Sequence, residues 1–195
     1  MFRRGFKTWA ERTSLRARQR LNLAVSAPLD PFRLADLLGV PVVTLSELSE
    51  LPDGVRRRLS TEHRDSWSAI TVTEGSCHLV VVNSSHPPTR LNSSLAHEIA
   101  HIILGHEPAL MFMSPASAIA LRTHNEEQEQ EASWLAGCLL LPREALVLIR
   151  RTAKSDEDAR SEYGVSAAML RFRFNVTGVD AQLRRSRGYK HRSGR

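Results

Sequence analysis

The chain has 195 residues and a formal net charge of +6, with 42% hydrophobic and 25% charged residues, as is ordinary for a globular protein with one substantial core. Its longest apolar runs fall well short of a membrane span, and no apolar signal segment follows the basic N-terminus. We therefore expect a cytoplasmic protein that does not contact a membrane.

Helical periodicity and capping residues predict most of the secondary structure. Residues 6–23 predict an amphipathic helix whose arginines face mostly solvent. Asp30 and Pro31 begin a second helix that Gly39 ends. Residues 46–51 predict one helical turn, followed by a turn at 52–54. Later helices are expected at residues 126–140, 143–151, 156–163 and 167–175, and the last two, joined at Gly164, resemble a helix-turn-helix.

Segments rich in β-branched residues predict three strands, at residues 42–45, 67–72 and 77–83. The second and third flank Glu74-Gly75 and therefore predict an antiparallel hairpin. The stretch from 106 to 125 is less regular, and we expect it to contain one short helix at 116–121 and, as a whole, to overhang the functional site. Cys77 and Cys138 fit buried thiols better than a disulfide framework or a thiolate zinc site.

The positive charge is concentrated at the two ends of the chain. Residues 1–20 hold seven Arg or Lys and one acid, and residues 184–195 hold six Arg or Lys and no acid. Basic ends of this kind bind nucleic acid or acidic partners in some proteins, and in most they are simply solvated. We expect residues 181–195 to form a disordered basic tail.

The sequence His97-Glu98-Ile99-Ala100-His101 follows the predicted hairpin. On a helix, the two histidines lie one turn apart on one face, where both can bind a single zinc ion. Glu98 cannot reach the same ion, but it can reach a water molecule on it as a general base. Residues 92–94 offer N-caps and Gly105 offers a C-terminal stop, so this segment is predicted to be helical.

A catalytic zinc ion normally has three protein ligands, so a further residue must contribute. His106 follows the helix-ending glycine and is not favoured as that ligand. In the helix at 126–140, rotation by about 100° per residue turns Glu129 toward the apolar side and the other glutamates away from it. Glu129 is therefore the predicted third ligand and Glu131 the reserve. Glu107 stands where a metzincin needs a histidine, which excludes that class.

These residues resemble the ImmA/IrrE metalloendopeptidases. The likeness runs through residues 68–72, 97–106, 129–136, 139–142 and 163–166, and it covers most of residues 66–175. The resemblance implies a cytoplasmic prokaryotic protease, of a family that often acts on DNA-binding repressors. It also implies a gluzincin-like site, with His97, His101 and Glu129 on zinc and Glu98 as the base. The chain departs from the family at Phe172-Arg173-Phe174, where an Arg-Leu pair is expected.

We therefore predict an α+β, zincin-like fold with a small antiparallel sheet and an active-site helix, followed by a helical C-terminal part with a helix-turn-helix-like segment. The predicted regions are an N-terminal helical region packed on the core (1–60), the metallopeptidase core (61–152), the helix-turn-helix-like lobe (153–180) and the basic tail (181–195). The predicted function is a Zn²⁺-dependent endopeptidase that cleaves a protein substrate, a helix-turn-helix repressor. The oxyanion donor is left open among Tyr163, His86 and His124.

The alternative is a DNA-binding transcriptional regulator in which the metal site is only structural. The basic ends and the helix-turn-helix-like segment favour it. Against it, the helix at 167–175 offers few base-reading side chains beyond Arg171, Arg173 and Asn175. Direct nucleic-acid binding is therefore the less favoured prediction.

Overall fold

The computed structural model describes the chain except for residues 1, 50–51, 107–110, 115–116, 123–124 and 193–195. The helices are α1 (Phe6–Arg20), α2 (Pro31–Leu38), α3 (Asp53–Ser60), α4 (Pro88–Leu104), α5 (Glu126–Leu140), α6 (Arg143–Arg151), α7 (Asp156–Tyr163), α8 (Ala167–Thr177) and α9 (Val179–Arg192). The strands are β1 (Val42–Thr44), β2 (Ala69–Glu74), β3 (Cys77–Val82), β4 (Met111–Ser114) and β5 (Ser117–Arg122). The predicted α+β class is confirmed.

A three-stranded sheet with the order β1-β3-β2 supports one side of the molecule. The predicted antiparallel hairpin is confirmed: Glu74 pairs with Cys77 across a two-residue turn in which Gly75 has a φ of 59°. β1 pairs with β3 in parallel, so the sheet is mixed and not purely antiparallel. The central strand β3 buries Val80, Val81 and Val82, which explains its unbroken apolar run.

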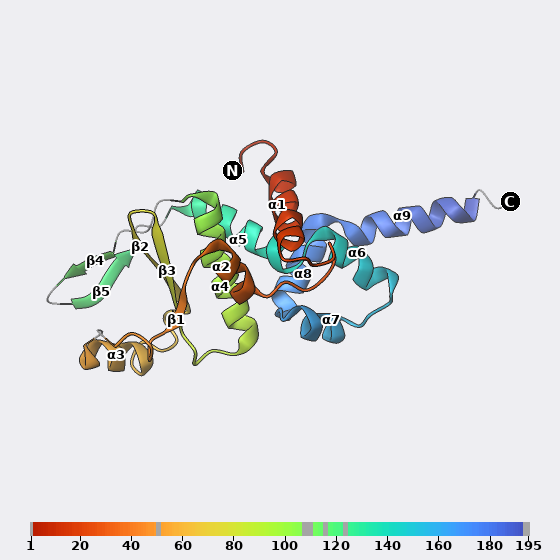
Figure 1. The fold of residues 1–195 in the computed structure, drawn as a ribbon. Coiled ribbons are helices and arrows are strands. Elements are labelled where there is room, and N and C mark those ends of the chain that lie inside the picture. The colour runs from red at the N-terminus through yellow and green to blue at the C-terminus, as the bar shows by residue number, and fades with distance from the viewer. Residues whose placement is uncertain (1, 50–51, 107–110, 115–116, 123–124, 193–195) are drawn as a thin grey trace.

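Helices α4 and α5 pack against each other and form the centre of the hydrophobic core. α4 also contacts β2 and β3, while α1 lies against α5. Figure 1 shows these two helices between the sheet at one end of the molecule and helices α6 to α9 at the other. In α5 the first half is polar, whereas all but one of the residues from Ala132 to Leu140 are buried. One helix therefore carries both the acidic candidates and a large part of the core.

Several helix boundaries agree with the capping signals in the sequence. The side chains of Asp30, Asn125, Ser155 and Ser166 each accept hydrogen bonds from backbone N–H groups of the helix that follows. Gly105 ends α4 with a φ of 64°. The start of α4 was predicted too late, because Pro88 at the first helical position begins the helix and places residues 92–94 inside it.

Three segments differ from the prediction in the type of secondary structure. The turn expected at 52–54 is the beginning of α3, whose Asp53 and terminal arginines complement the helix dipole although none of its residues is buried. The single helical turn expected at 46–51 is only a hydrogen-bonded turn over its described part. The short helix expected at 116–121 is wrong for its described residues 117–121, which belong to β5 and pair with β4. The alanines and the leucine of that segment are compatible with a helix or a strand, and pairing with β4 makes the segment a strand.

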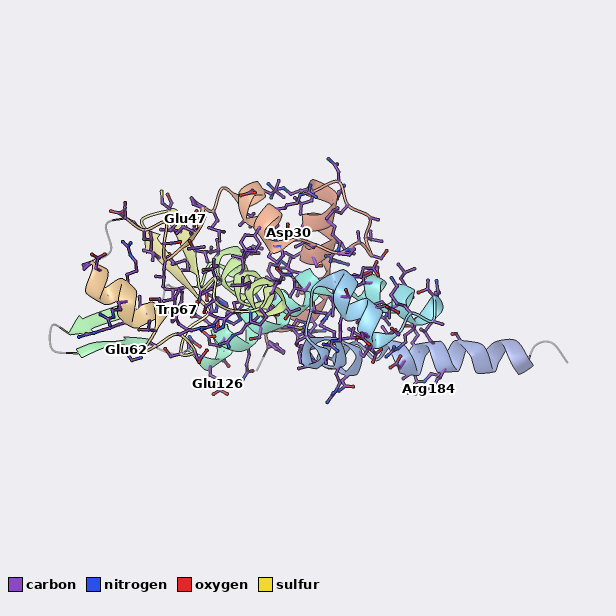
Figure 2. The ribbon with its side chains drawn as sticks, turned by 90° about the horizontal axis from the view of Figure 1, so that it is seen from below. Asp30, Glu47, Glu62, Trp67, Glu126 and Arg184 are labelled. Carbon is purple, nitrogen blue, oxygen red and sulfur yellow. The ribbon has the colours of Figure 1, made fainter. Side chains whose placement is uncertain are left out.

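The expected disordered tail is also wrong for residues 181–192, which belong to α9. Val179 is fully buried and Asp180 pairs with Arg150 at 2.9 Å, so the first turn is anchored on the body. Arginine, glutamine and alanine are good helix formers and extend the helix from that anchor. α9 projects away from the packed body in both views, and Arg184 marks it in Figure 2.

The two cysteines have different environments. Cys138 is buried, and burial raises the pKa of its thiol to about 12, so it stays protonated at neutral pH. Cys77 was expected to be buried, but it is exposed because it opens β3 directly after the hairpin turn. Neither lies in the group of metal-binding side chains that the described residues contain.

No single helix among the described residues is both long enough and apolar enough to cross a membrane. Only α5 and α6 taken together, with a bend of 44° between them, pass such a test by length and composition, as buried core helices also do.

Candidate metal centre

The two histidines of the motif lie one turn apart on α4, near its C-terminal end. Leu95 and Ile99 are fully buried against the core, which fixes the rotation of the helix about its axis. His97 and His101 therefore share the neighbouring, partly exposed face, with 23% and 14% of their side-chain surfaces accessible. Their Nε2 atoms lie 3.0 Å apart.

Glu129 reaches the same point from the first turn of α5. Its Oε2 lies 3.1 Å from Nε2 of His97, and its Oε1 lies 3.5 Å from Nε2 of His101. One ligand atom from each of the three residues falls within 4.8 Å of the others. Around a tetrahedral zinc ion with bonds of about 2.0–2.1 Å, ligand atoms stand roughly 3.3–3.4 Å apart. The donor set and its spacing therefore fit a zinc ion.

Glu98, the residue between the histidines on the sequence, lies on the sheet side of the same helix. It is only 4% exposed, and its Oε2 accepts a hydrogen bond of 2.5 Å from the hydroxyl of Thr71 on β2. A buried carboxylate needs such a donor, because desolvation without a hydrogen bond is costly. The hydrogen bond fixes the carboxylate against β2.

Further side chains contact the ring nitrogens of the histidines that face away from this point. The Oγ atom of Ser133 on α5 lies 3.4 Å from Nδ1 of His97. Nδ1 of His101 lies 3.0 Å from Nδ1 of His106, whose Nε2 lies 3.4 Å from Oε2 of Glu131. Both ring orientations are thus constrained from behind, as is usual for histidines that bind metals.

The structure brings His97, His101 and Glu129 together, and Glu98 follows His97 on the same helix with its carboxylate on Thr71 of β2. His106 and Glu131 contact each other instead of the central point, which is consistent with the rotation argument against Glu131 as third ligand. Thr71 and Ser133 were not singled out, because only the tertiary packing of β2 and α5 on α4 brings them to the site. A strand position alone gives no signal for such a contact.

Two of the three candidate oxyanion donors are engaged in other contacts. The hydroxyl of Tyr163 donates to the carbonyl oxygen of Ser26 at 2.7 Å, and Nε2 of His86 lies 2.9 Å from the carbonyl oxygen of Trp67. His124 lies outside the described residues. The described contacts therefore assign this role to none of the three.

Comparison with known proteins identifies a family that matches most of the chain. A sequence model of the peptidase M78 family, described as the IrrE N-terminal-like domain, matches residues 34–175. No curated protein matches the sequence significantly. A similar solved structure is described as a Mycobacterium tuberculosis transcriptional regulator, with 16% sequence identity and a TM-score of 0.47. The similarity covers 87% of this chain and 46% of that chain, so this chain spans less than half the length of that relative.

Proposed function

The chain belongs to the peptidase M78 family, that of the IrrE N-terminal-like domain, and we propose that it is a zinc-dependent endopeptidase acting on a protein substrate. The observation that supports this most strongly is the convergence of His97, His101 and Glu129 within 4.8 Å, with Glu98 on the same helix as the histidines. Two imidazoles and one carboxylate are a ligand set found in catalytic zinc sites, which keep a further position open.

His97, His101 and Glu129 would hold the ion, and each contributes one atom through a side chain fixed by α4 or α5. Zinc supplies Lewis acidity, which lowers the pKa of a bound water molecule and polarises a carbonyl group. The three side chains are 14% to 24% exposed, so the point they surround is accessible from solvent. A site that is built on two packed helices and open on one side suits catalysis better than a closed structural site.

Glu98 would serve as the general base. Its carboxylate takes a proton from the attacking water and delivers it to the amine that leaves when the peptide bond breaks. The low exposure of this carboxylate and its hydrogen bond to Thr71 support the assignment, because a base must be held in a fixed position to act repeatedly. Glu98 has no corresponding duty if the metal only stabilises the fold.

The edge of the sheet next to this base offers a place for the substrate. β2 is the outer strand in the order β1-β3-β2, and its residue Thr71 contacts Glu98. Val80, opposite Thr71, donates its N–H to Pro41 on the β1 side, so Thr71 and Thr73 direct their N–H groups away from β3. We propose that an extended segment of the substrate adds to this edge as a further strand.

The substrate class follows from the family resemblance. We propose that a DNA-binding repressor of the helix-turn-helix type is cleaved, since proteases resembling this chain often act on such proteins. An added strand binds mainly through its backbone, so the edge of β2 selects an extended or locally unfolded segment more than a particular sequence.

The proposal is tested by metal content and cleavage measured on the same preparations. Purified chain should bind about one zinc ion, and a chelator should abolish cleavage of a protein substrate that added zinc then restores. Glu129→Ala should lose the zinc, whereas Glu126→Ala, which changes an exposed acid in the same first turn, should keep it. Full zinc retention by Glu129→Ala would refute the ligand set.

The DNA-binding alternative has less support. Of the three base-reading candidates on α8, Arg173 is fully buried and binds the carbonyl oxygen of Leu141 at 2.8 Å and Glu11 at 2.6 Å. The turn at Gly164 packs against α4, where Asn92 donates a hydrogen bond to its carbonyl oxygen at 3.3 Å. The first turn of α7 is acidic and would repel phosphates. We therefore propose that α7 and α8 mainly pack against the core.

A binding assay separates the two functions. Salt-dependent binding of the full chain to duplex DNA, lost on Arg171→Ala with Asn175→Ala, would favour the regulator. We expect instead that any DNA binding is weak and is unaffected by these two substitutions.

A further inference from the structure

We infer that His106 and Glu131 form a positioning relay that fixes the orientation and the tautomer of His101 and so strengthens its bond to the metal. The inference rests on the proposed zinc site. It concerns two residues that were considered as ligands themselves and that the proposed chemistry does not use.

The relay runs through three side chains from α4, its C-terminal cap and α5. Nδ1 of His101 lies 3.0 Å from Nδ1 of His106, and Nε2 of His106 lies 3.4 Å from Oε2 of Glu131. The side chain of His106 is 7% exposed and that of Glu131 is 19% exposed, so little water competes for these contacts. The two imidazole rings meet edge to face, with centroids 4.9 Å apart.

Proton positions along this chain have only one consistent assignment when His101 binds a metal through Nε2. Nδ1 of His101 then carries the proton and donates a hydrogen bond, so Nδ1 of His106 must accept that bond with its lone pair. Neutral His106 therefore carries its proton on Nε2, which points to the carboxylate of Glu131. Each group is satisfied by the next, and the opposite tautomer of His106 would set two N–H groups against each other.

The backbone places His106 where the relay needs it. Its N–H donates to the carbonyl oxygen of His101 at 3.1 Å, and the N–H of Gly105 donates to that of Ile102 at 3.1 Å. These two bonds, with a φ of 64° at Gly105, make a Schellman cap. In such caps an apolar contact usually joins the side chains at the two positions that His101 and His106 occupy here. In this chain a pair of imidazoles takes the place of that apolar contact.

The other histidine has a weaker support. Nδ1 of His97 faces the hydroxyl of Ser133 at 3.4 Å, and Ser133 is exposed. Outer contacts to a metal-binding histidine typically change metal affinity by about 10- to 100-fold. We therefore expect the relay to account for a substantial part of the zinc affinity of this chain, through His101.

The test compares the zinc dissociation constants of full-length variants by competition with a chelator. His106→Phe keeps a ring of similar size without the nitrogens and should weaken zinc binding roughly 10- to 100-fold. His106→Asn keeps an acceptor near the position of Nδ1 and should recover most of that loss. Glu131→Gln should weaken binding a few-fold, while Glu126→Gln, an exposed acid on the same helix, should not change it.

Two further readouts separate a relay from simple packing. The thermal unfolding temperature of the metal-free protein should be nearly the same for His106→Phe and His106→Asn. The visible absorption spectrum of the cobalt-loaded protein should change in His106→Phe, because His101 is then free to rotate, and should resemble that of the unaltered chain in His106→Asn.

Each outcome decides between the relay and the proposed function. If the unaltered chain binds zinc and His106→Phe binds it equally well, the relay is refuted and the proposed function stands. If His106→Phe and His106→Asn lose affinity equally and both lower the stability of the metal-free protein, His106 only packs, and the relay is again refuted. An unaltered chain that binds no zinc would refute the proposed function, and the relay with it.

Discussion

Glu98 lies in a setting that suits a base held in place for repeated use. Its carboxylate is almost fully buried, and the hydroxyl of Thr71 donates to it across the interface between α4 and β2. A hydrogen bond to a charged group typically contributes about 1.5–3 kcal/mol, more than one between neutral groups. The sheet therefore does more than support α4, since one of its side chains orients the proposed catalytic residue.

Thr71→Val tests this contact at the scale of one hydroxyl. The variant keeps the branched shape of the side chain and removes the donor, so it should fold and retain zinc. We expect kcat for cleavage to fall roughly tenfold with little change in KM, because the base loses its orienting bond. Thr73→Val, on the same strand but hydrogen-bonded to His78, should cleave normally. Unchanged kcat in Thr71→Val would show that Glu98 needs no such support.

The candidate site was predictable from the sequence where one helix encodes it. The spacing of His97 and His101 follows from helical periodicity alone, and the choice of Glu129 follows from the rotation of α5 about its apolar side. Thr71 and the relay through His106 were not predictable, because they depend on how separate elements pack. Sequence periodicity describes one element at a time.

At the scale of elements, α5 is held by side chains that bind the carbonyl groups at its C-terminal end. Ser14 donates to the carbonyl oxygen of Cys138 at 2.6 Å, and Arg18 donates to that of Leu139 at 2.8 Å, both from α1. From α8, Arg173 donates to that of Leu141 at 2.8 Å. These are carbonyls that the helix itself leaves without partners. Arg173 of the Phe172-Arg173-Phe174 segment therefore serves in packing.

Arg18→Met should reveal how much this attachment stabilises the fold. Burial lowers the pKa of Arg18 to about 10, so the guanidinium is still charged at neutral pH, and each of its three nitrogens donates a hydrogen bond. Losing them should lower the free energy of unfolding by roughly 2–3 kcal/mol, measured by urea denaturation. Arg20→Met, on the same helix but exposed, should change it by less than about 0.5 kcal/mol. Equal effects of the two substitutions would contradict this role.

The outer edge of β2 can be tested with one proline. Thr73→Pro removes an N–H that points away from β3, so the pairing of the hairpin is retained. We expect the variant to fold and bind zinc but to cleave a protein substrate with a KM raised several-fold. Thr73→Val loses the same side-chain hydroxyl and keeps the N–H, so it is the matched control. A variant that folds and cleaves as well as this control would exclude strand addition at this edge.

The elements that the sequence predicted well are those with local signals. Capping side chains at Asp30, Asn125, Ser155 and Ser166 fix helix starts through contacts within two or three residues. The hairpin of β4 and β5 and the helix α9 were missed because their stability comes from a partner strand and from a docked first turn. The start of α4 was expected at the capping residues 92–94, whereas Pro88 begins the helix four residues earlier.

At the scale of the whole molecule, the site lies where two parts of the chain meet. α4 carries the two histidines, and α5, which follows later in the sequence, contributes Glu129. The polar start of α5 faces the sheet half, and its apolar end is enclosed by α1 and α8 (Figure 1). The ion pair of Arg173 with Glu11, at 2.6 Å, connects α8 to α1. Packing at a distance therefore sets the position of the third proposed ligand.

The most direct measurement compares zinc content and target cleavage in Glu98→Gln. The variant keeps the size of the side chain and a group that accepts from Thr71, but it removes the base. We predict that it folds, binds zinc as the unaltered chain does and still binds its protein target, while cleavage falls by a factor of roughly 10² or more. A chelated sample of the unaltered chain serves as the inactive control. Undiminished cleavage by Glu98→Gln with zinc bound would contradict the proposed role of Glu98, and an unchanged biological effect in cells without cleavage would mean that the chain acts by binding.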